Sequence, residues 1–270
     1  MKSMRLALLL SILTVTQSLA NDAPLVAAAS SLRQVWPLLM QAYSQTTQPR
    51  VTFGSSGNLS RQIIQSAPFE LFLSADLVYP EQLHARGISI DKPAPYTNGA
   101  LAWVALEGTT LAQWINGATD EPFEASPFNT PTEPYEVNPF GIAHTAKLAV
   151  ANPAFAPYGR AAKQVLVATT SNSISTLKFT LGENAAQALQ FALSGATDGG
   201  IVPLSLVSGV ALEQLPPIVV GEISATLHQP ITHSMVLINQ PSLSSQSLYT
   251  FLLSEAAQSI FKRNGFRAIN

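Results

Sequence analysis

The feature that most constrains the fold is a regular alternation of short apolar runs with helical patterns. Residues 25–28 are a short apolar run that predicts a buried strand, and residues 51–53 and 71–73 predict a second and a third short strand. Between them, residues 32–43 and 58–65 place their large apolar side chains on one helical face. Strands that alternate with helices usually pair in parallel, because each helix carries the chain back across the sheet. The sequence therefore predicts an α/β fold.

The same alternation continues to the end of the chain. Further strands are predicted at 99–106, 148–151, 200–202, 218–220 and 233–239, and further helices at 161–167, 185–193, 242–253 and 256–264. The strands at 99–106 and 233–239 are candidates for crossings between two lobes. A chain of 270 residues can bury its core as one large or two moderate domains.

The N-terminal segment has the order of a secretory signal peptide. Lys2 and Arg5 form a short positive region, and residues 6–15 are mostly apolar. A small-x-small cleavage site then ends at Ala20. No segment of the chain reaches the ~18 apolar residues of a transmembrane helix. We therefore expect residues 1–20 to be removed and the mature chain to be periplasmic; the alternative is a buried N-terminal helix.

Composition excludes several classes of function. The chain has no cysteine, hence no disulfide framework, no thiolate metal site and no lipid-modified cysteine. A formal net charge of −2 with 11% charged residues lacks the basic footprint of a nucleic-acid-binding protein. There is no His-x-x-x-His pair or dense carboxylate cluster for a metal cation, and the single acids Glu70 and Asp76 are expected to be caps or surface charges. A small anion is not excluded, because backbone N–H groups alone can bind one.

The amino-acid composition of the chain changes between residues 118 and 141. Five prolines break any regular element there, and five acidic residues make the segment negative. Such a composition predicts a long surface loop. A docking loop for a partner is the functional alternative.

Three predicted strand-to-helix loops share one design. Residues 30–31 (SS), 55–57 (SSG) and 157–159 (PYG) each lie between a predicted strand and the helix that follows it. In open α/β sheets, ligands bind outside the carboxyl ends of the strands. Helix N-termini there present unpaired N–H groups and the positive end of the dipole. Each serine taken alone is more often a helix cap, so the hypothesis of a binding site rests on the three loops together.

Such a collection of donors suits a fully deprotonated tetrahedral dianion. Molybdate, tungstate and sulfate carry no proton near neutral pH, so their oxygens only accept hydrogen bonds. Monohydrogen phosphate carries a proton and needs an acceptor in the site. A buried mismatch of this kind costs about 1–3 kcal/mol, which is enough to discriminate. Molybdate and sulfate differ in size, which the loop sequences do not reveal.

Seven short motifs, in their order and spacing, give a family resemblance. The chain resembles the periplasmic molybdate-binding protein family over almost all of its mature length. The motifs are residues 26–32 (VAAASSL), 53–59 (FGSSGNL), 67–76 (APFELFLSAD), 148–153 (LAVANP), 156–159 (APYG), 182–185 (GENA) and 260–266 (IFKRNGF). The resemblance implies a type II, two-lobed binding-protein fold in which each lobe is a mostly parallel sheet flanked by helices and two hinge strands join the lobes.

The resemblance also implies the residues that hold the oxyanion. Ser31, with Ser30 beside it, matches the family's first binding loop, and Ser56 matches the second. Tyr158 matches the third loop, where relatives offer a backbone amide and some a tyrosine. Ala185 matches the fourth and would donate its backbone N–H. Molybdate or tungstate is then the ligand at these residues, with no cofactor and no bare metal cation.

One position departs from many members of the family. They have a tyrosine just after the strand that corresponds to residues 200–202, and its hydroxyl reaches the ligand. This chain has Pro203, which has neither a side-chain donor nor an N–H. Our hypothesis is that the Tyr158 hydroxyl replaces that donor from another side of the pocket. The loop at 118–141 is also longer than is usual in the family.

The expected mechanism is capture by closure of two lobes. Residues 21–103 and 229–270 would form the first lobe and residues 104–228 the second. A ligand that contacts both lobes favours the closed state. The closed form, expected to be a monomer, would then dock on an inner-membrane permease of an ABC-type importer.

Two other interpretations stay open. A different anion, such as sulfate or a larger organic anion, would use the same fold with another pocket size. An exported serine hydrolase would need a Gly-x-Ser-x-Gly elbow with a histidine and an acid. Residues 54–57 lack that spacing, and the histidines at 84, 144, 228 and 233 form no paired motif. These histidines are therefore expected to be surface residues or hydrogen-bonded core residues.

Overall fold

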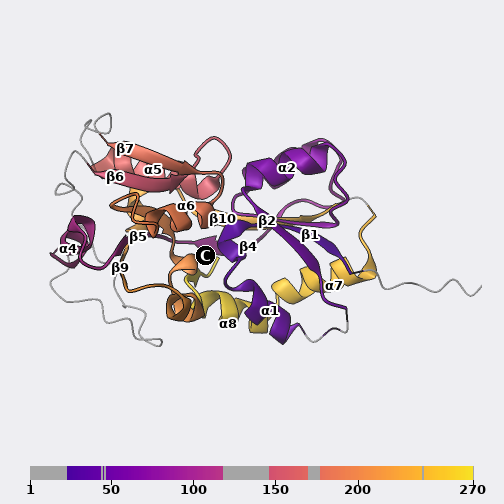
Figure 1. The fold of residues 1–270 in the computed structure, drawn as a ribbon. Coiled ribbons are helices and arrows are strands. Elements are labelled where there is room, and N and C mark those ends of the chain that lie inside the picture. Colours follow the sequence, from indigo (N-terminus) through magenta and orange to yellow (C-terminus); the bar gives the residue numbers. More distant parts are fainter. Residues whose placement is uncertain are drawn as a thin grey trace, which may run out of the picture.

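The computed structural model describes residues 23–43, 45, 47–117, 146–169, 177–238 and 240–269. The predicted signal peptide and the predicted proline-rich loop at 118–141 lie outside the described residues. Figure 1 shows two lobes side by side, each with its own sheet.

The first lobe contains a six-stranded sheet in the order β11-β4-β10-β3-β1-β2. Strand β1 pairs in parallel with β2 and β3, and β10 runs antiparallel to β3 and β4. The strands are β1 (Leu25–Ala29), β2 (Arg50–Gly54), β3 (Leu71–Ser74), β4 (Ala94–Gly99), β10 (Ile231–Leu237) and β11 (Phe266–Arg267). The α-helices of this lobe are α1 (Trp36–Ala42), α2 (Ser56–Ile64), α3 (Val78–Ala85), α7 (Leu243–Leu252) and α8 (Glu255–Arg263).

Strand β1 shows why this sheet is covered on both faces. Successive side chains of a strand point to opposite faces, so an unbroken apolar run needs two cores. Val26 and Ala28 pack into the cluster formed with α1, α7 and α8, while Ala27 packs with Leu59 of α2 and Leu83 of α3. Helix α2 accordingly lies on one side of the sheet, and α1, α7 and α8 lie on the other (Figure 1).

The second lobe contains a five-stranded sheet in the order β7-β6-β8-β5-β9. Strand β6 pairs in parallel with β7 and β8, and β5 runs antiparallel to β8 and β9. The strands are β5 (Leu101–Leu106), β6 (Lys147–Ala151), β7 (Lys178–Gly182), β8 (Gly199–Pro203) and β9 (Ile218–Glu222). The α-helices are α4 (Thr110–Gly117), α5 (Pro157–Thr169) and α6 (Ala185–Ala192).

The chain passes between the sheets at two places. The first crossing is at Ala100, between β4 and β5, within the segment predicted as one strand. The return runs through residues 223–230, so the predicted return strand at 233–239 follows the crossing and lies in the first sheet as β10. Residues 101–103, assigned above to the first lobe, belong to β5 of the second sheet. The exact lobe limits stay a prediction.

The predicted helix at 32–43 is wrong at its start. The chain leaves β1 in a 3₁₀ turn at Ser30–Leu32, and the α-helix begins only at Trp36. The reason is Pro37, which has no N–H to donate and is tolerated only in the first turn of a helix. The α/β class predicted from the alternation of strands and helices is confirmed by the two sheets.

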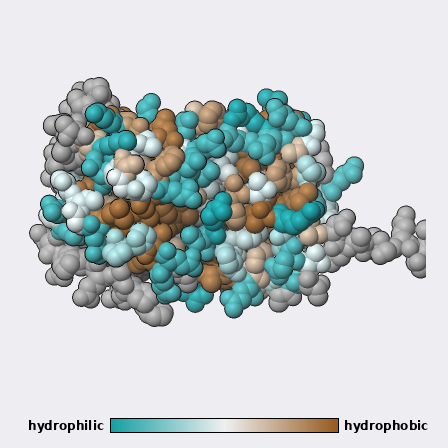
Figure 2. Space-filling view, in the orientation of Figure 1, coloured by the Kyte–Doolittle hydropathy of each residue, from teal (hydrophilic) through white to brown (hydrophobic). Residues whose placement is uncertain are grey.

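The surface is mixed rather than uniformly polar. On the face shown in Figure 2, hydrophilic side chains are spread over both lobes and apolar ones gather over part of the second lobe. Within the described residues, no helix has the length and apolar character required to cross a membrane.

Candidate functional site

The 3₁₀ turn after β1 buries two serines at the junction of the lobes. The Ser30 hydroxyl oxygen accepts a 3.3 Å hydrogen bond from the N–H of Ala186 in the second lobe. Ser31 is 1% exposed, and its Oγ has no hydrogen-bond partner at normal geometry among the described residues. Its backbone oxygen accepts from the hydroxyl of Ser205 at 2.9 Å. The turn thus contacts the second lobe while its second hydroxyl remains free to donate.

The loop before α2 contributes a second pair of buried serines. Ser55 is the N-cap residue of α2, yet its side chain makes no capping bond, and its buried Oγ lacks a partner in the described part of the chain. The Ser56 Oγ accepts from the N–H of Ala75 at 3.0 Å, which leaves its own proton available. The N–H of Gly57 donates to the oxygen of Phe155 in the second lobe at 2.9 Å. This loop therefore also lies at the junction.

Tyr158 enters the junction from the first turn of α5. It is 3% exposed, and its hydroxyl lies 3.0 Å from Nε2 of His233 on β10 of the first lobe. Burial raises the pKa of the Tyr158 hydroxyl strongly, while the neighbouring Ser31 hydroxyl acts in the opposite direction. Tyr158 passes so close to β4 that a Cβ on Gly99 would collide with its hydroxyl. The phenol therefore stays protonated between two lobes.

Ala185 begins helix α6 and is buried. Asn184 caps the helix by accepting from the N–H of Gln187 at 3.1 Å. The N–H groups of the first helical turn have no partner within the helix, and the dipole makes that end positive. Because the N–H of Ala186 already reaches Ser30, the N-terminus of α6 points at the serine turn of the first lobe.

The residues predicted from the sequence lie along the junction of the two lobes. Ala29 and Ala75 of the first lobe pack in the same buried cluster as Tyr158 and Ala185 of the second. The cross-lobe hydrogen bonds bring Ser30 and the loop of Ser56 to the same junction. What they offer is a set of neutral donors at helix N-termini, which is suited to a small anion.

Asp76 and Arg160 form an ion pair across the junction, where the sequence suggested a cap or a surface charge for Asp76. The carboxylate caps the N–H of Tyr79 at 3.3 Å, accepts from the Ser74 hydroxyl at 2.9 Å, and pairs with the Arg160 guanidinium from α5. Burial raises the pKa of Asp76, although Ser74 and Arg160 oppose that rise. The pair links the lobes and neutralises both charges.

Residues 24–267 match the family described as "Bacterial extracellular solute-binding protein". The chain belongs to this family. The molybdate-binding protein ModA of Azotobacter vinelandii is 29% identical over 225 residues, which is 80% of this chain and 77% of that protein. Members of the family bind solutes, so this protein is a binding protein and not an enzyme.

Two solved structures share the fold of this solute-binding protein. The Azotobacter vinelandii periplasmic molybdate-binding protein superposes with a TM-score of 0.72 at 22% identity, covering 92% of this chain and 100% of that one. The sulfate-binding protein SubI from Mycobacterium tuberculosis H37Rv superposes with a TM-score of 0.66 at 14% identity, covering 92% and 87%. The predicted two-lobed α/β architecture is confirmed.

Of the four histidines, His144 lies outside the described residues, and the other three are surface residues or hydrogen-bonded core residues as expected. His233 is completely buried, and its two ring nitrogens are hydrogen-bonded to the hydroxyls of Tyr96 and Tyr158. His84 lies 3.2 Å from the Ser89 hydroxyl. No described group of three or more His, Cys, Asp or Glu residues is arranged to hold a metal ion.

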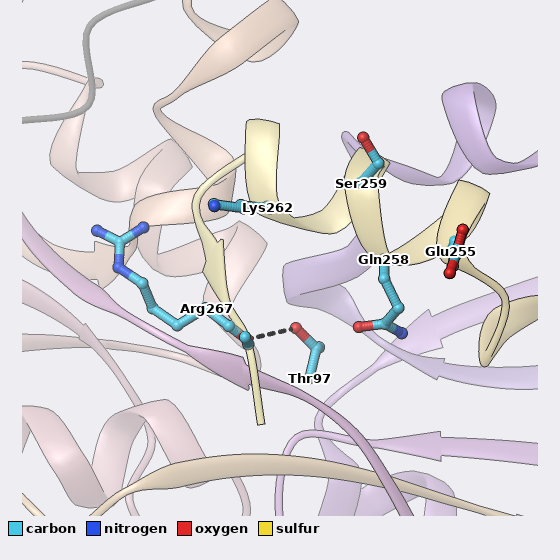
Figure 3. Close-up of a pocket in the computed structure, with 7 residues that line it drawn as sticks. Thr97, Glu255, Gln258, Ser259, Lys262 and Arg267 are labelled. Atoms are coloured by element: carbon cyan, nitrogen blue, oxygen red, sulfur yellow. Dashed lines mark hydrogen bonds between the residues drawn. The ribbon is translucent and has the colours of Figure 1, made fainter. Parts of the chain in front are cut away.

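A hollow of about 320 Å³ on the first lobe is separate from the site of this solute-binding protein. Figure 3 shows it between α8 and β4, where the Thr97 hydroxyl donates to the backbone oxygen of Arg267 at 3.0 Å. Its other lining side chains include the exposed Glu255, Ser259 and Lys262. None of the predicted site residues lines it.

Sequence reasoning missed three residues of the junction. Ser55 was seen as part of its loop but not as a binding residue, and Ser205 and His233 were not selected. The doubled serine at 55–56 was a usable signal for Ser55, because a single N-cap needs only one of them. Ser205 and His233 carry no such signal, since their partners lie 174 and 75 residues away.

Proposed function

We propose that the protein captures molybdate or tungstate in the periplasm and delivers it to an ABC-type importer. The observation that carries this is a pair of buried hydroxyls, Ser31 Oγ and Ser55 Oγ, without hydrogen-bond partners beside helix N-termini of both lobes. Buried polar groups are almost always paired, so such groups at a lobe junction call for a ligand that accepts hydrogen bonds.

The charges at the junction favour an anion without a proton. Asp76 is an acid at the junction of the lobes, and Arg160 and Ser74 already occupy its oxygens. A protonated anion such as monohydrogen phosphate would therefore lack a free acceptor. Neutral hydroxyl and N–H donors satisfy molybdate, tungstate or sulfate without a bare cation.

The relatives support the heavier oxyanions over sulfate. The sequence relative at 29% identity is named as a molybdate-binding protein, whereas the sulfate-binding protein resembles this chain in fold alone. Ser30, Ser31, Ser56, Tyr158 and the Ala185 N–H are the proposed donors. Sulfate remains the alternative, because its oxygens accept in the same way and only its size differs.

Capture would proceed by closure of the lobes. The proposed donors come from both lobes, so an anion that bridges them binds the closed form more tightly than the open one. The closed monomer would then dock on the membrane permease. Small-angle scattering tests this step, since saturating molybdate should make the mature protein more compact.

Isothermal titration of the purified mature chain is the decisive experiment. We expect one-to-one binding of molybdate and tungstate that millimolar sulfate and phosphate do not displace. Binding of sulfate with equal or greater affinity would change the ligand but leave the site. No binding of any tetrahedral anion would refute the proposed function.

A further inference from the structure

Two buried tyrosines bracket one buried histidine at the edge of the proposed site. The Tyr96 hydroxyl lies 3.3 Å from Nδ1 of His233, and the Tyr158 hydroxyl lies 3.0 Å from Nε2. Both phenol rings meet the imidazole nearly edge-on, with centroids 5.8 and 5.7 Å away. Tyr96 and His233 belong to the first lobe and Tyr158 to the second, so the three side chains join the lobes.

The imidazole is neutral under all physiological conditions. Burial lowers the pKa of His233 to about 3 and raises the pKa of both tyrosines. A neutral imidazole has one N–H donor and one bare nitrogen that accepts. One tyrosine must therefore donate to His233 while the other accepts from it, and the tautomer decides which does which.

The surroundings of Tyr96 select the tautomer. Tyr96 is fully buried, and within the described residues its hydroxyl is hydrogen-bonded to His233 alone. If Tyr96 accepted from Nδ1–H, its own proton would be buried without an acceptor. An unmet buried donor is more costly than an unused lone pair. Tyr96 therefore donates to Nδ1, and the imidazole proton lies on Nε2.

The hydroxyl proton of Tyr158 is then not used in the hydrogen bond to His233. Its oxygen accepts from Nε2–H, so the hydroxyl proton is directed away from His233. Ser31 also lies beside the Tyr158 hydroxyl, and its own Oγ has no partner at normal geometry among the described residues. The chain of hydrogen bonds from Tyr96 through His233 thus ends in a donor that faces the serine turn.

We propose that His233 and Tyr96 are positioning residues that fix the Tyr158 hydroxyl as a donor toward a fully deprotonated oxyanion. This inference rests on the proposed function and deepens it. With its oxygen engaged by the imidazole, Tyr158 offers the anion a proton and no ready acceptor. The same arrangement disfavours an anion that carries a proton, such as monohydrogen phosphate, and supplies the donor that Pro203 lacks.

The first test reads the tautomer directly. In protein labelled with ¹⁵N-histidine, long-range ¹H–¹⁵N correlations distinguish the protonated from the bare ring nitrogen. We expect His233 to carry its proton on Nε2, with no change of the His233 signals across neutral pH. A proton on Nδ1 would overturn the inference, whatever the affinity for molybdate.

The second test separates positioning from packing. Tyr96→Phe keeps the ring but removes the donor to Nδ1, so it should weaken molybdate binding roughly tenfold and narrow the preference for molybdate over phosphate. His233→Gln can accept from Tyr96 and donate to Tyr158, so it should retain more affinity than His233→Leu. Tyr43→Phe, a buried tyrosine far along the first lobe that donates to Ser244, is the matched control and should bind as the wild type does.

The outcomes distinguish the two proposals. If the wild type binds molybdate and Tyr96→Phe has unchanged affinity and selectivity, the positioning role of Tyr96 and His233 (the relay) is overturned and the proposed function stays intact. Failure of the wild type to bind any tetrahedral anion would overturn the proposed function, and with it the role of Tyr158 toward a ligand. A weakened Tyr96→Phe that remains as heat-stable as Tyr43→Phe, with the proton on Nε2, would support the relay.

Discussion

Replacing Ser31 by alanine should separate binding from stability. Ser31 is 1% exposed, and its Oγ has no hydrogen-bond partner at normal geometry within the described residues. Its removal therefore breaks no hydrogen bond of normal geometry within the described residues, and it takes away only the contact with the Tyr158 hydroxyl beside it. A hydrogen bond to a charged group contributes about 1.5–3 kcal/mol, so Ser31→Ala should raise the Kd for molybdate roughly 10- to 150-fold.

Ser56→Ala is the informative counterpart. The Ser56 Oγ accepts from the N–H of Ala75 at 3.0 Å, and the mutation leaves that buried N–H unpaired. The expected loss is about 1–3 kcal/mol of unfolding free energy, and each kcal/mol lowers Tm by about 2–4 °C for a chain of this size. Ser56→Ala should thus lose both affinity and stability, whereas Ser31→Ala should lose affinity alone.

Thermal unfolding and titration on the same samples test the pair. Ser259→Ala, an exposed position on α8, serves as the control and should change neither quantity. A Tm of ligand-free Ser31→Ala several degrees below that of the wild type would show that its hydroxyl has a structural partner. An unchanged Kd in Ser31→Ala would remove that hydroxyl from the binding site.

Three further changes probe the junction and the sheet. Arg160→Ala leaves the buried Asp76 carboxylate unpaired and should lower Tm at neutral pH. Because burial raises the pKa of Asp76 above its usual 3.8, this deficit should shrink in thermal scans as pH falls toward 3.8 and the carboxyl is protonated; a constant deficit would contradict the ion pair. Glu70 accepts a hydrogen bond from the Ser242 N–H at 2.8 Å. Burial alone would raise the Glu70 pKa, but the hydrogen bonds from Ser242 and Ser245 outweigh it and lower that pKa. Glu70→Gln should therefore destabilise above pH 4.5, with the difference vanishing in acid; an equal loss at all pH values would refute this. Gly57→Ala would place a Cβ 2.9 Å from the oxygen of Phe155, so scattering should show poorer closure with molybdate, and normal compaction would contradict it.

The sequence predicted the fold well where local pattern decides the structure. The strands at 25–28 and 71–73 were found because parallel strands buried on both faces are continuous apolar runs, whereas the strand at 51–53 is a partly exposed edge strand. The start of α1 was misplaced because apolar periodicity outweighed the effect of Pro37. Strand β4 was not predicted, and the crossing at Ala100 fell inside the strand predicted at 99–106, although the turn-forming dipeptide Asn98-Gly99 stands directly before it.

The candidate site was predictable in its loops but not in its network. Ser31 and Ser56 follow β1 and β2, whose ends lie together because the two strands pair in parallel, and Ala185 follows β7 of the second sheet. The partners of Asp76 and Tyr158 lie 84 and 75 residues away, so only the packing of the lobes identifies them. Whether Tyr158 meets the ligand through its hydroxyl stays a prediction.

The cross-lobe contacts suggest how affinity is divided between protein and ligand. The Asp76–Arg160 pair and the bond from Gly57 N–H to Phe155 join the lobes through protein atoms alone. Such contacts raise the population of the closed form, and apparent affinity rises with the fraction that is binding-competent. The hydroxyls of Ser31 and Ser55 have no hydrogen-bond partner of normal geometry within the described residues, and an anion that accepts hydrogen bonds would supply one. Closure would then depend on the ion pair, and selectivity on the donors. Arg160→Ala should therefore weaken the binding of molybdate and of sulfate by the same factor. Ser31→Ala and Tyr96→Phe should instead change the ratio of the affinities for these anions to the affinity for phosphate.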